Sequence, residues 1–403
     1  MRHRFWQQSG FTLIELMISV TIGLVIMLAM TGVYVNVSSV NTELSKTNNL
    51  LENGRFALDI LQEDLSHAGY WGGYVPQFDD LSVTAAPADT PTGSAPDPCL
   101  AYSTANWTTA YVNGLLGIPV QTYDASPSGC SALLGNKKTS TDVLVVRHAE
   151  TCLPDASNCE ASSASKLYFQ ASFCQAEYAA ATPVRYVLSN TAANFVLKKT
   201  GCTGTPPGTT GTLADKRKFI SNIYYIRNYS VTSGDGIPTL MRSSFNLGGA
   251  GGTAGFETAT PLIDGIDGFS VELGLDMKSR CNSAVDYAAV PAFVDPATAA
   301  STCSASATVA NNTLPSNRGD GVPETPFVRC TTAVPCTAAQ LANTVVVKIY
   351  VLARNSASTA GYTDAKTYSL GSTTLGPFND GFRRHVFQTT VRLNNISGRR
   401  ATP

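Results

Sequence analysis

The pattern of apolar and polar positions divides the chain into three stretches. Met1–Gly10 is basic and polar, Phe11–Val35 is apolar with Glu15 as its one charged residue, and the remainder alternates polar segments with short apolar ones. About 20 consecutive apolar residues cross a bilayer core as a helix, so the second stretch predicts a membrane-spanning helix. Arg2 and Arg4 ahead of it predict a cytoplasmic N-terminus, with everything after the helix outside the cytoplasm.

The helical pattern continues past the apolar stretch. No proline falls between Phe11 and Tyr74, and glycines gather at Gly69–Gly73, where a helix would end. We therefore expect one continuous helix of roughly 55 residues, apolar in residues 11–35 and amphipathic in residues 36–74. A free coiled coil is disfavoured because a sustained heptad repeat is lacking. The apolar positions of the second part are Val40, Leu44, Leu51, Leu58, Leu61 and Leu65.

Residues 75–403 carry strand signals separated by long loops rich in Gly, Pro, Ala, Ser and Thr. Strands are indicated by runs of β-branched and aromatic residues. The predicted architecture is α+β: a long N-terminal helix packed on an antiparallel sheet in a head with large loops. The predicted strands are Asp142–His148, Val184–Leu188, Phe195–Lys198, Phe219–Tyr229, Phe269–Leu275, Val345–Ala353 and His385–Leu393.

The charge and the cysteine content limit the partners and the cellular compartment that the protein can have. Charged residues make up 14% of the chain and the net charge is −1, which disfavours a nucleic-acid partner because such a partner requires a clustered basic face. The ten cysteines all follow the predicted helix, so we expect an oxidising compartment and up to five disulfides, with the pairing left open. Metal binding is the weaker alternative. The cysteines are Cys99, Cys130, Cys152, Cys159, Cys174, Cys202, Cys281, Cys303, Cys330 and Cys336.

The order of features at the N-terminus is unusual for an export signal. A secretory signal is cleaved after its apolar stretch, whereas here the small residue Gly10 precedes the stretch. A charge within a membrane span is costly and is usually functional, and Glu15 lies in the first turn. On these grounds alone a plain signal-anchor, with Glu15 at the interface, stays an alternative.

Ser9–Leu16 (SGFTLIEL) resembles the processing site of type IV prepilins. The resemblance implies that a prepilin peptidase cuts after Gly10 and methylates Phe11, and that Glu15 neutralises the amino terminus of an adjacent subunit in a filament. A buried charge needs such a partner, and stacked, offset helices would supply it.

Further segments resemble the PilW-type minor pilins of the type IV pilus. They are His67–Tyr70, Ile223–Arg227, Pro261–Phe269, Val345–Arg354, Arg383–Phe387 and Val391–Asn394. Their order along the chain is more specific than any one of them. The chain is also longer than ordinary major pilins, which favours a minor pilin.

Candidate chemistry outside the N-terminus is sparse. Asn317, Asp320 and Glu324 are spaced like a truncated calcium loop, but Ca²⁺ prefers 6–8 oxygen ligands, so we favour a simple turn and expect no cofactor. The sequence contains no nucleophile, phosphate-loop or metalloprotease motif, so an enzyme is not expected. The Tyr70–Tyr74 aromatics are expected to plug the junction of helix and head rather than to form a partner patch.

The favoured hypothesis is a non-enzymatic minor pilin that assembles with other minor pilins and primes pilus growth at the pilus tip. The resemblance implies other minor pilins, the major pilin, a large tip adhesin and prepilin peptidase as partners. It also implies an inner-membrane protein with a periplasmic head before assembly, and a place at the cell surface afterwards. The alternatives are an adhesin module displayed on the pilus and a minor pseudopilin of type II secretion.

Overall fold

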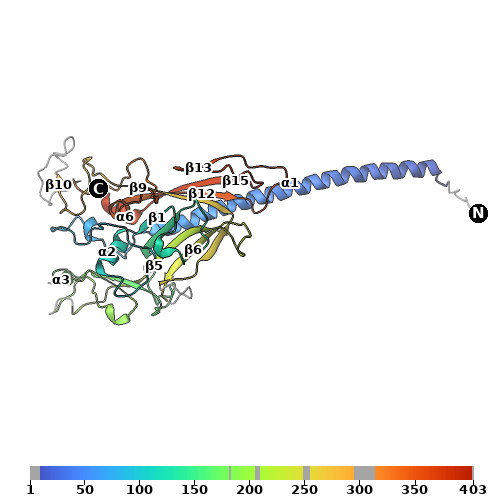
Figure 1. Ribbon diagram of the computed structural model, residues 1–403. Coiled ribbons are helices and arrows are strands. Elements are labelled where there is room, and N and C mark those ends of the chain that lie inside the picture. Colours follow the sequence, from blue (N-terminus) through green and yellow to red (C-terminus); the bar gives the residue numbers. More distant parts are fainter. Residues whose placement is uncertain (1–9, 181–182, 205–208, 248–254, 295–313, 402–403) are drawn as a thin grey trace, which may run out of the picture.

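The computed structural model describes residues 10–180, 183–204, 209–247, 255–294 and 314–401. A single helix, α1 (Leu13–His67, 55 residues), runs out of a β-rich head (Figure 1). The prediction of one long helix is confirmed. It ends at His67 rather than near residue 74, because Gly69 adopts a left-handed backbone (φ 73°) and its N–H donates to Arg147 O instead of continuing the helix.

Two antiparallel sheets enclose the end of α1. The first has the strand order β15–β12–β9, with β15 spanning Arg384–Arg392, β12 Thr344–Arg354 and β9 Ile266–Leu275. The second, eight-stranded sheet is centred on β5 (Lys216–Arg227), which pairs with β2 (Val143–Ala149) and β6 (Thr239–Asn246). Its other strands are β1 (Val120–Tyr123), β3 (Tyr168–Ala171), β4 (Tyr186–Ser189), β7 (Gly255–Phe256) and β8 (Thr260–Asp264).

Short elements complete the head. The helices are α2 (Thr109–Gly117), α3 (Gln175–Tyr178), α5 (Ala338–Ala342) and α6 (Asn394–Arg400), with 3-10 turns at Gln77–Asp79, Ser128–Cys130 and Ala192–Asn194. Two small hairpins are β10 (Phe293–Val294) with β11 (Leu314–Pro315), and β13 (Tyr368–Leu370) with β14 (Thr373–Leu375).

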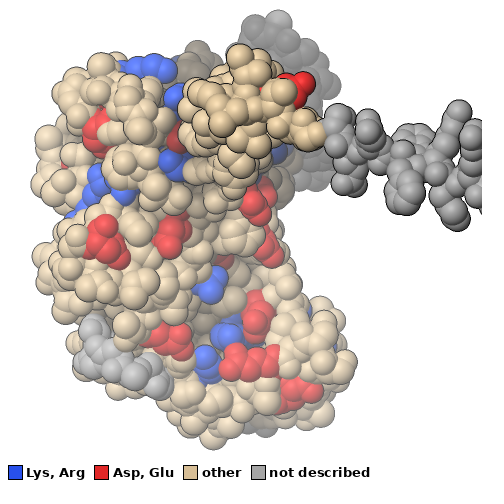
Figure 2. Space-filling view, turned by 90° about the vertical axis from the view of Figure 1, so that its right-hand side faces the viewer, with Lys and Arg blue, Asp and Glu red and all other residues tan. Residues whose placement is uncertain are grey.

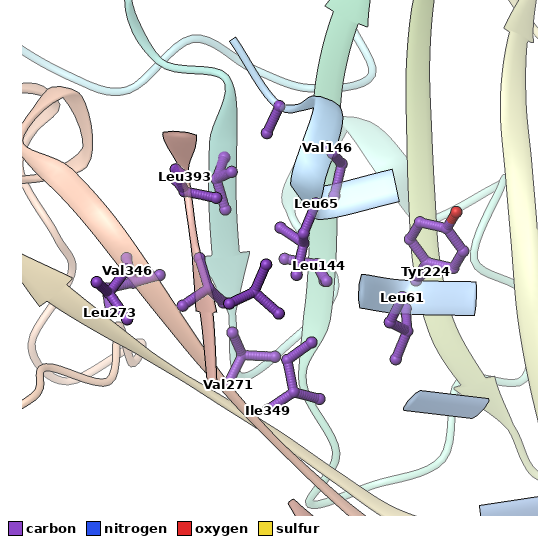
Figure 3. Close-up of a cluster of buried hydrophobic side chains, with 14 of the residues drawn as sticks. Leu61, Leu65, Leu144, Val146, Tyr224, Val271, Leu273, Val346, Ile349 and Leu393 are labelled. Atoms are coloured by element: carbon purple, nitrogen blue, oxygen red, sulfur yellow. The ribbon is translucent and has the colours of Figure 1, made fainter. Parts of the chain in front are cut away.

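The main core lies between the sheets, with α1 as its centre. Leu61 and Leu65, both fully buried, project between Leu144 of one sheet and Ile349 of the other (Figure 3). Side chains alternate across a strand, so Val143 and Val145 of β2 point away from α1 into a second core. Strand β2 is therefore buried on both faces, which accounts for its almost continuous run of apolar residues.

The second core contains the aromatic residues that follow α1. Trp71 is 1% exposed and its ring packs between Phe169 and Phe219, while its Nε1 donates to Leu116 O at 3.1 Å. Tyr74 is also buried, against Phe169. The prediction that this cluster closes the junction of helix and head is confirmed.

One predicted strand is wrong. Phe195–Lys198 is extended but joins no sheet: the Leu197 N–H donates to the side chain of Gln170, and only an isolated bridge links Lys198 to Leu213. Its alternating apolar residues, Phe195 and Leu197, are buried, and the ring of Phe195 packs against Tyr168 of β3. The other predicted strands correspond to β2, β4, β5, β9, β12 and β15.

Disulfides fasten the loops of the head. The bonded pairs among described residues are Cys99–Cys130, Cys152–Cys159, Cys174–Cys202 and Cys330–Cys336. Cys281 is also disulfide-bonded, and Cys303 lies outside the described residues. The sequence had left this pairing open because loop geometry decides which thiols meet.

Candidate assembly site on the N-terminal helix

The first part of α1 is not buried by any part of the chain that the structure describes. Every residue from Leu13 to Thr42 is exposed, and we call this segment the projecting half of α1. Its apolar part is long enough to cross a membrane and has none of its surface buried by the head. Leu13 and Leu28, for example, are 77% and 79% exposed. An apolar surface of this size requires lipid or other protein around it.

Gly10, Phe11 and Glu15 lie together at the tip of this half. Gly10 has no heavy atom near the position of a Cβ, and Phe11 is 83% exposed, so the bond between them is accessible on all sides. Thr12 is the N-cap of α1. Its N–H and hydroxyl both donate to Glu15 Oε2, at 3.0 and 2.9 Å, while Glu15 N donates to Thr12 Oγ1 at 3.4 Å.

This capping box gives Glu15 a role within the chain that the sequence analysis did not consider. The carboxylate accepts the backbone N–H of the N-cap residue Thr12, which has no partner within the helix. It also lies where the positive end of the helix dipole favours an anion. Both hydrogen bonds from Thr12 use Oε2, so the other carboxylate oxygen, Oε1, is available to accept from a neighbouring amino group.

The rest of the helix, Glu43–His67, is fixed to the head, and we call it the packed half. Asp64 is its polar anchor. His148 Nε2 lies 2.9 Å from Asp64 Oδ1, and Asn222 Nδ2 and Tyr224 OH donate to Oδ2 at 3.1 and 2.9 Å. These partners come from β2 and β5, so one carboxylate ties the helix to the middle of the larger sheet. Burial and the Asp64 carboxylate raise the pKa of Tyr224, which keeps this phenol a hydrogen-bond donor.

A second contact, between Gly54 and Phe387, joins α1 to the smaller sheet. Gly54 is buried, and a Cβ added there would overlap the ring of Phe387 on β15. The missing side chain therefore lets the aromatic ring rest on the helix backbone. By contrast, Gly23 and Gly32 of the projecting half have nothing near them.

A third contact holds the start of the packed half. Glu43 accepts hydrogen bonds from Lys46 Nζ and Thr359 Oγ1, both at 2.8 Å, and Lys46 Nζ also donates to Ser358 O at 3.0 Å. These bonds, from Lys46 first and then from Thr359, hold the pKa of Glu43 below its usual value. The loop between β12 and β15 thus meets the helix where the helix leaves the head.

The sequence analysis predicted none of these three contacts, which are made by Asp64, Gly54 and Glu43. A signal was present for Asp64, an acidic residue directly beside the apolar positions Leu61 and Leu65. Gly54 is a glycine within a helical pattern, which by itself indicates only a point where the helix can bend. Nothing in the sequence indicated that Thr359 reaches the helix.

The candidate calcium residues each bind backbone amides. Asn317 Oδ1 accepts from Ala292 N (2.8 Å), Asp320 Oδ1 from Val322 N (2.9 Å) and Glu324 Oε2 from Met277 N (2.7 Å). Only the Asp320 bond lies within a turn, whereas the other two tie the loop to Ala292 and Met277. The buried Asp276 accepts from the N–H groups of Asp320 and Gly321, and burial raises its pKa to about 6.

Arg318, inside the same loop, points into the protein. It is 2% exposed, and its guanidinium donates to Phe78 O and Ala289 O at 3.1 and 2.6 Å and stacks over the ring of Tyr287. The Arg-Gly-Asp triplet at Arg318–Asp320 is thus a structural turn and not a displayed ligand.

Within the described residues one cluster has the spacing of a metal site, formed by Glu150, Cys152 and Cys159. The two cysteines are bonded to each other, so their thiolates are not free to bind a metal. On the face of the head seen in Figure 2, acidic and basic side chains are interspersed among neutral ones.

A long apolar helix with an exposed projecting half, mounted on an antiparallel β head, agrees with the architecture expected for a pilin. A family profile described as "Prokaryotic N-terminal methylation motif" matches residues 7–31, and one described as "Type IV Pilus-assembly protein W" (PilW) matches residues 223–395. Together, these two matches support a minor pilin of the type IV pilus. None of the curated proteins and none of the solved structures matched it.

These matches agree with the anatomy of the chain. The methylation motif covers the tip of the projecting half, and the PilW match begins within β5 and ends in α6, covering β9, β12 and β15. Pilin families are structural proteins rather than enzymes, and they interact with other components of the pilus. The motif and the apolar helix support membrane anchoring.

Proposed function

We propose that this minor pilin primes pilus assembly together with other minor pilins, and that it takes a position at the pilus tip. The exposed projecting half of α1 is the observation that supports this function most directly. Its apolar surface fits the bilayer before assembly and the bundle of pilin helices afterwards. The size of the head favours a terminal position, because a helical filament repeats every contact along its length.

In this proposal the prepilin peptidase cuts after Gly10, and Phe11 becomes the methylated N-terminus. The head, with its disulfides, lies in the periplasm until assembly. Glu15 then exchanges part of its capping role for an ion pair with the amino terminus of a neighbouring subunit. The neighbours are other minor pilins and the major pilin, and the tip position allows contact with a large adhesin. The chain itself performs no catalysis and binds no nucleic acid.

Deletion of the gene tests this function. We expect surface pili and twitching to be abolished or sharply reduced, and to be restored by the intact gene on a plasmid. Normal piliation in the deletion strain would refute a priming role. Normal piliation with reduced adherence would instead indicate the alternative function, an adhesin module displayed on the pilus.

A further inference from the structure

The two edges of the smaller sheet differ in how their backbone groups are used. At the β9 edge, Leu273 and Val328 exchange both of their backbone hydrogen bonds, at 2.7 and 2.8 Å. Asp142 closes the same edge by accepting from Val271 N at 2.8 Å and donating its own N–H to Phe269 O at 2.9 Å. This edge is therefore covered by the chain itself.

The β15 edge is open. Leu393 N donates to Val345 O and Asn355 N to Arg383 O, so the odd-numbered residues of β15 pair with β12. In an antiparallel ladder the intervening residues turn their N–H and C=O groups to the other side. Within the described residues, no backbone partner meets these outward groups of Val386, Gln388 and Thr390.

The open edge also lacks the usual protection against strand pairing. Natural edge strands carry lysines, prolines or bulges that prevent another strand from adding. Between Val386 and Val391, β15 has no charged residue and no proline, and its register with β12 runs without a shift from Arg384 to Arg392. By contrast, the register between β12 and β9 shifts in two places.

The open edge lies beside the packed half of α1. At one end of the strand Arg383 faces Glu43 at 3.9 Å, and further along Thr389 Oγ1 donates to Gln62 Oε1 at 3.3 Å. Gln62 is exposed beside the strand. Packed helices lie about 8–10 Å apart, so a subunit whose helix packs along α1 brings its head to this edge.

We propose that the outer edge of β15 accepts an extended strand from the head of a neighbouring pilin subunit, so that the smaller sheet continues across the subunit boundary. The main-chain groups of Val386, Gln388 and Thr390 supply the hydrogen bonds, as in other cases of strand addition. This inference rests on the proposed function, because the partner is a subunit met during pilus assembly.

Proline at Gln388 tests the edge. Gln388→Pro removes an outward N–H while leaving the bonds to β12 intact, and prolines are tolerated on edge strands in this orientation. Gln388→Ala is the matched control, because it keeps the N–H and removes the same side chain. In the full-length protein, expressed in the deletion strain, we expect Gln388→Ala to restore piliation within twofold. Gln388→Pro should lower it at least tenfold at equal protein level.

Crosslinking supplies a second readout that does not depend on a stable proline variant. A benzophenone-bearing amino acid in place of Thr390 should, on irradiation of piliated cells, form a product with another pilin, identified by mass spectrometry. Full piliation by Gln388→Pro, or a product with no pilin in it, would overturn the edge proposal and leave the priming role standing. Normal piliation of the deletion strain would overturn the priming role. In that case the crosslink from Thr390 alone would test the edge proposal, and a product with another pilin would still support it.

Discussion

The two halves of α1 share one continuous helix but differ in what surrounds them. In the projecting half every residue is exposed, and polar side chains such as Ser19 and Thr21 donate hydrogen bonds to the helix backbone. In the packed half, Leu61 and Leu65 are fully buried and Asp64 binds three side chains of the larger sheet. The head covers the apolar surface of the packed half. The apolar surface of the projecting half requires lipid or other subunits to cover it.

The largest expected effect concerns the tip of the projecting half. Gly10→Lys should block cleavage, because a long charged side chain replaces the small residue before the cleaved bond. The retained leader should then prevent pilus incorporation. Mass spectrometry of the membrane-extracted protein measures this, with Gly10→Ala as a control that is still processed. A mature N-terminus at Phe11 in the lysine variant would contradict the prediction.

Asp64→Ala should lower the free energy of unfolding by about 2–4 kcal/mol, because three buried polar side chains lose their common hydrogen-bond acceptor. Urea unfolding of the detergent-solubilised protein, followed by tryptophan fluorescence, measures the loss. Asp59→Ala is the control: this acidic residue is exposed on the same helix, and its removal should change the stability by less than about 0.5 kcal/mol. Equal effects of the two changes would show that Asp64 is not an anchor.

The same substitution in each half should give different results. Gly54→Ala places a methyl group against Phe387 and should destabilise the head by about 1–3 kcal/mol through overpacking. Gly23→Ala meets no neighbour and should leave the melting temperature of the solubilised protein unchanged. A neutral Gly54→Ala would mean that β15 adjusts freely to the helix.

Calcium should have the smallest effect. Candidate oxygens on Asn317, Asp320 and Glu324 already accept backbone N–H groups, so millimolar Ca²⁺ should shift the melting temperature no more than EDTA does. A rise of several degrees that disappears in Asp320→Asn would instead establish a calcium site in this loop.

Local sequence patterns predicted the long helix and several of the strands. The long helix followed from an unbroken helical period without proline, and strands such as β2, β9 and β12 followed from dense β-branched residues. Phe195–Lys198 showed the limit of this reasoning, because a segment that packs two alternate side chains against the head has the same apolar alternation as a strand. Strand β6 was not predicted, because its polar residues Arg242, Ser243 and Ser244 interrupt the run of apolar residues that indicates a strand.

The sequence by itself determined the apolar helix, the processing motif with Gly10, Phe11 and Glu15, and the order of the main strands. These features depend on residues close together in the chain. Only the tertiary structure decided that Asp64 meets β2 and β5, that Arg318 is buried, and that β15 keeps an open edge. Those contacts join residues far apart in the chain, and their energies depend on distances that local patterns do not specify.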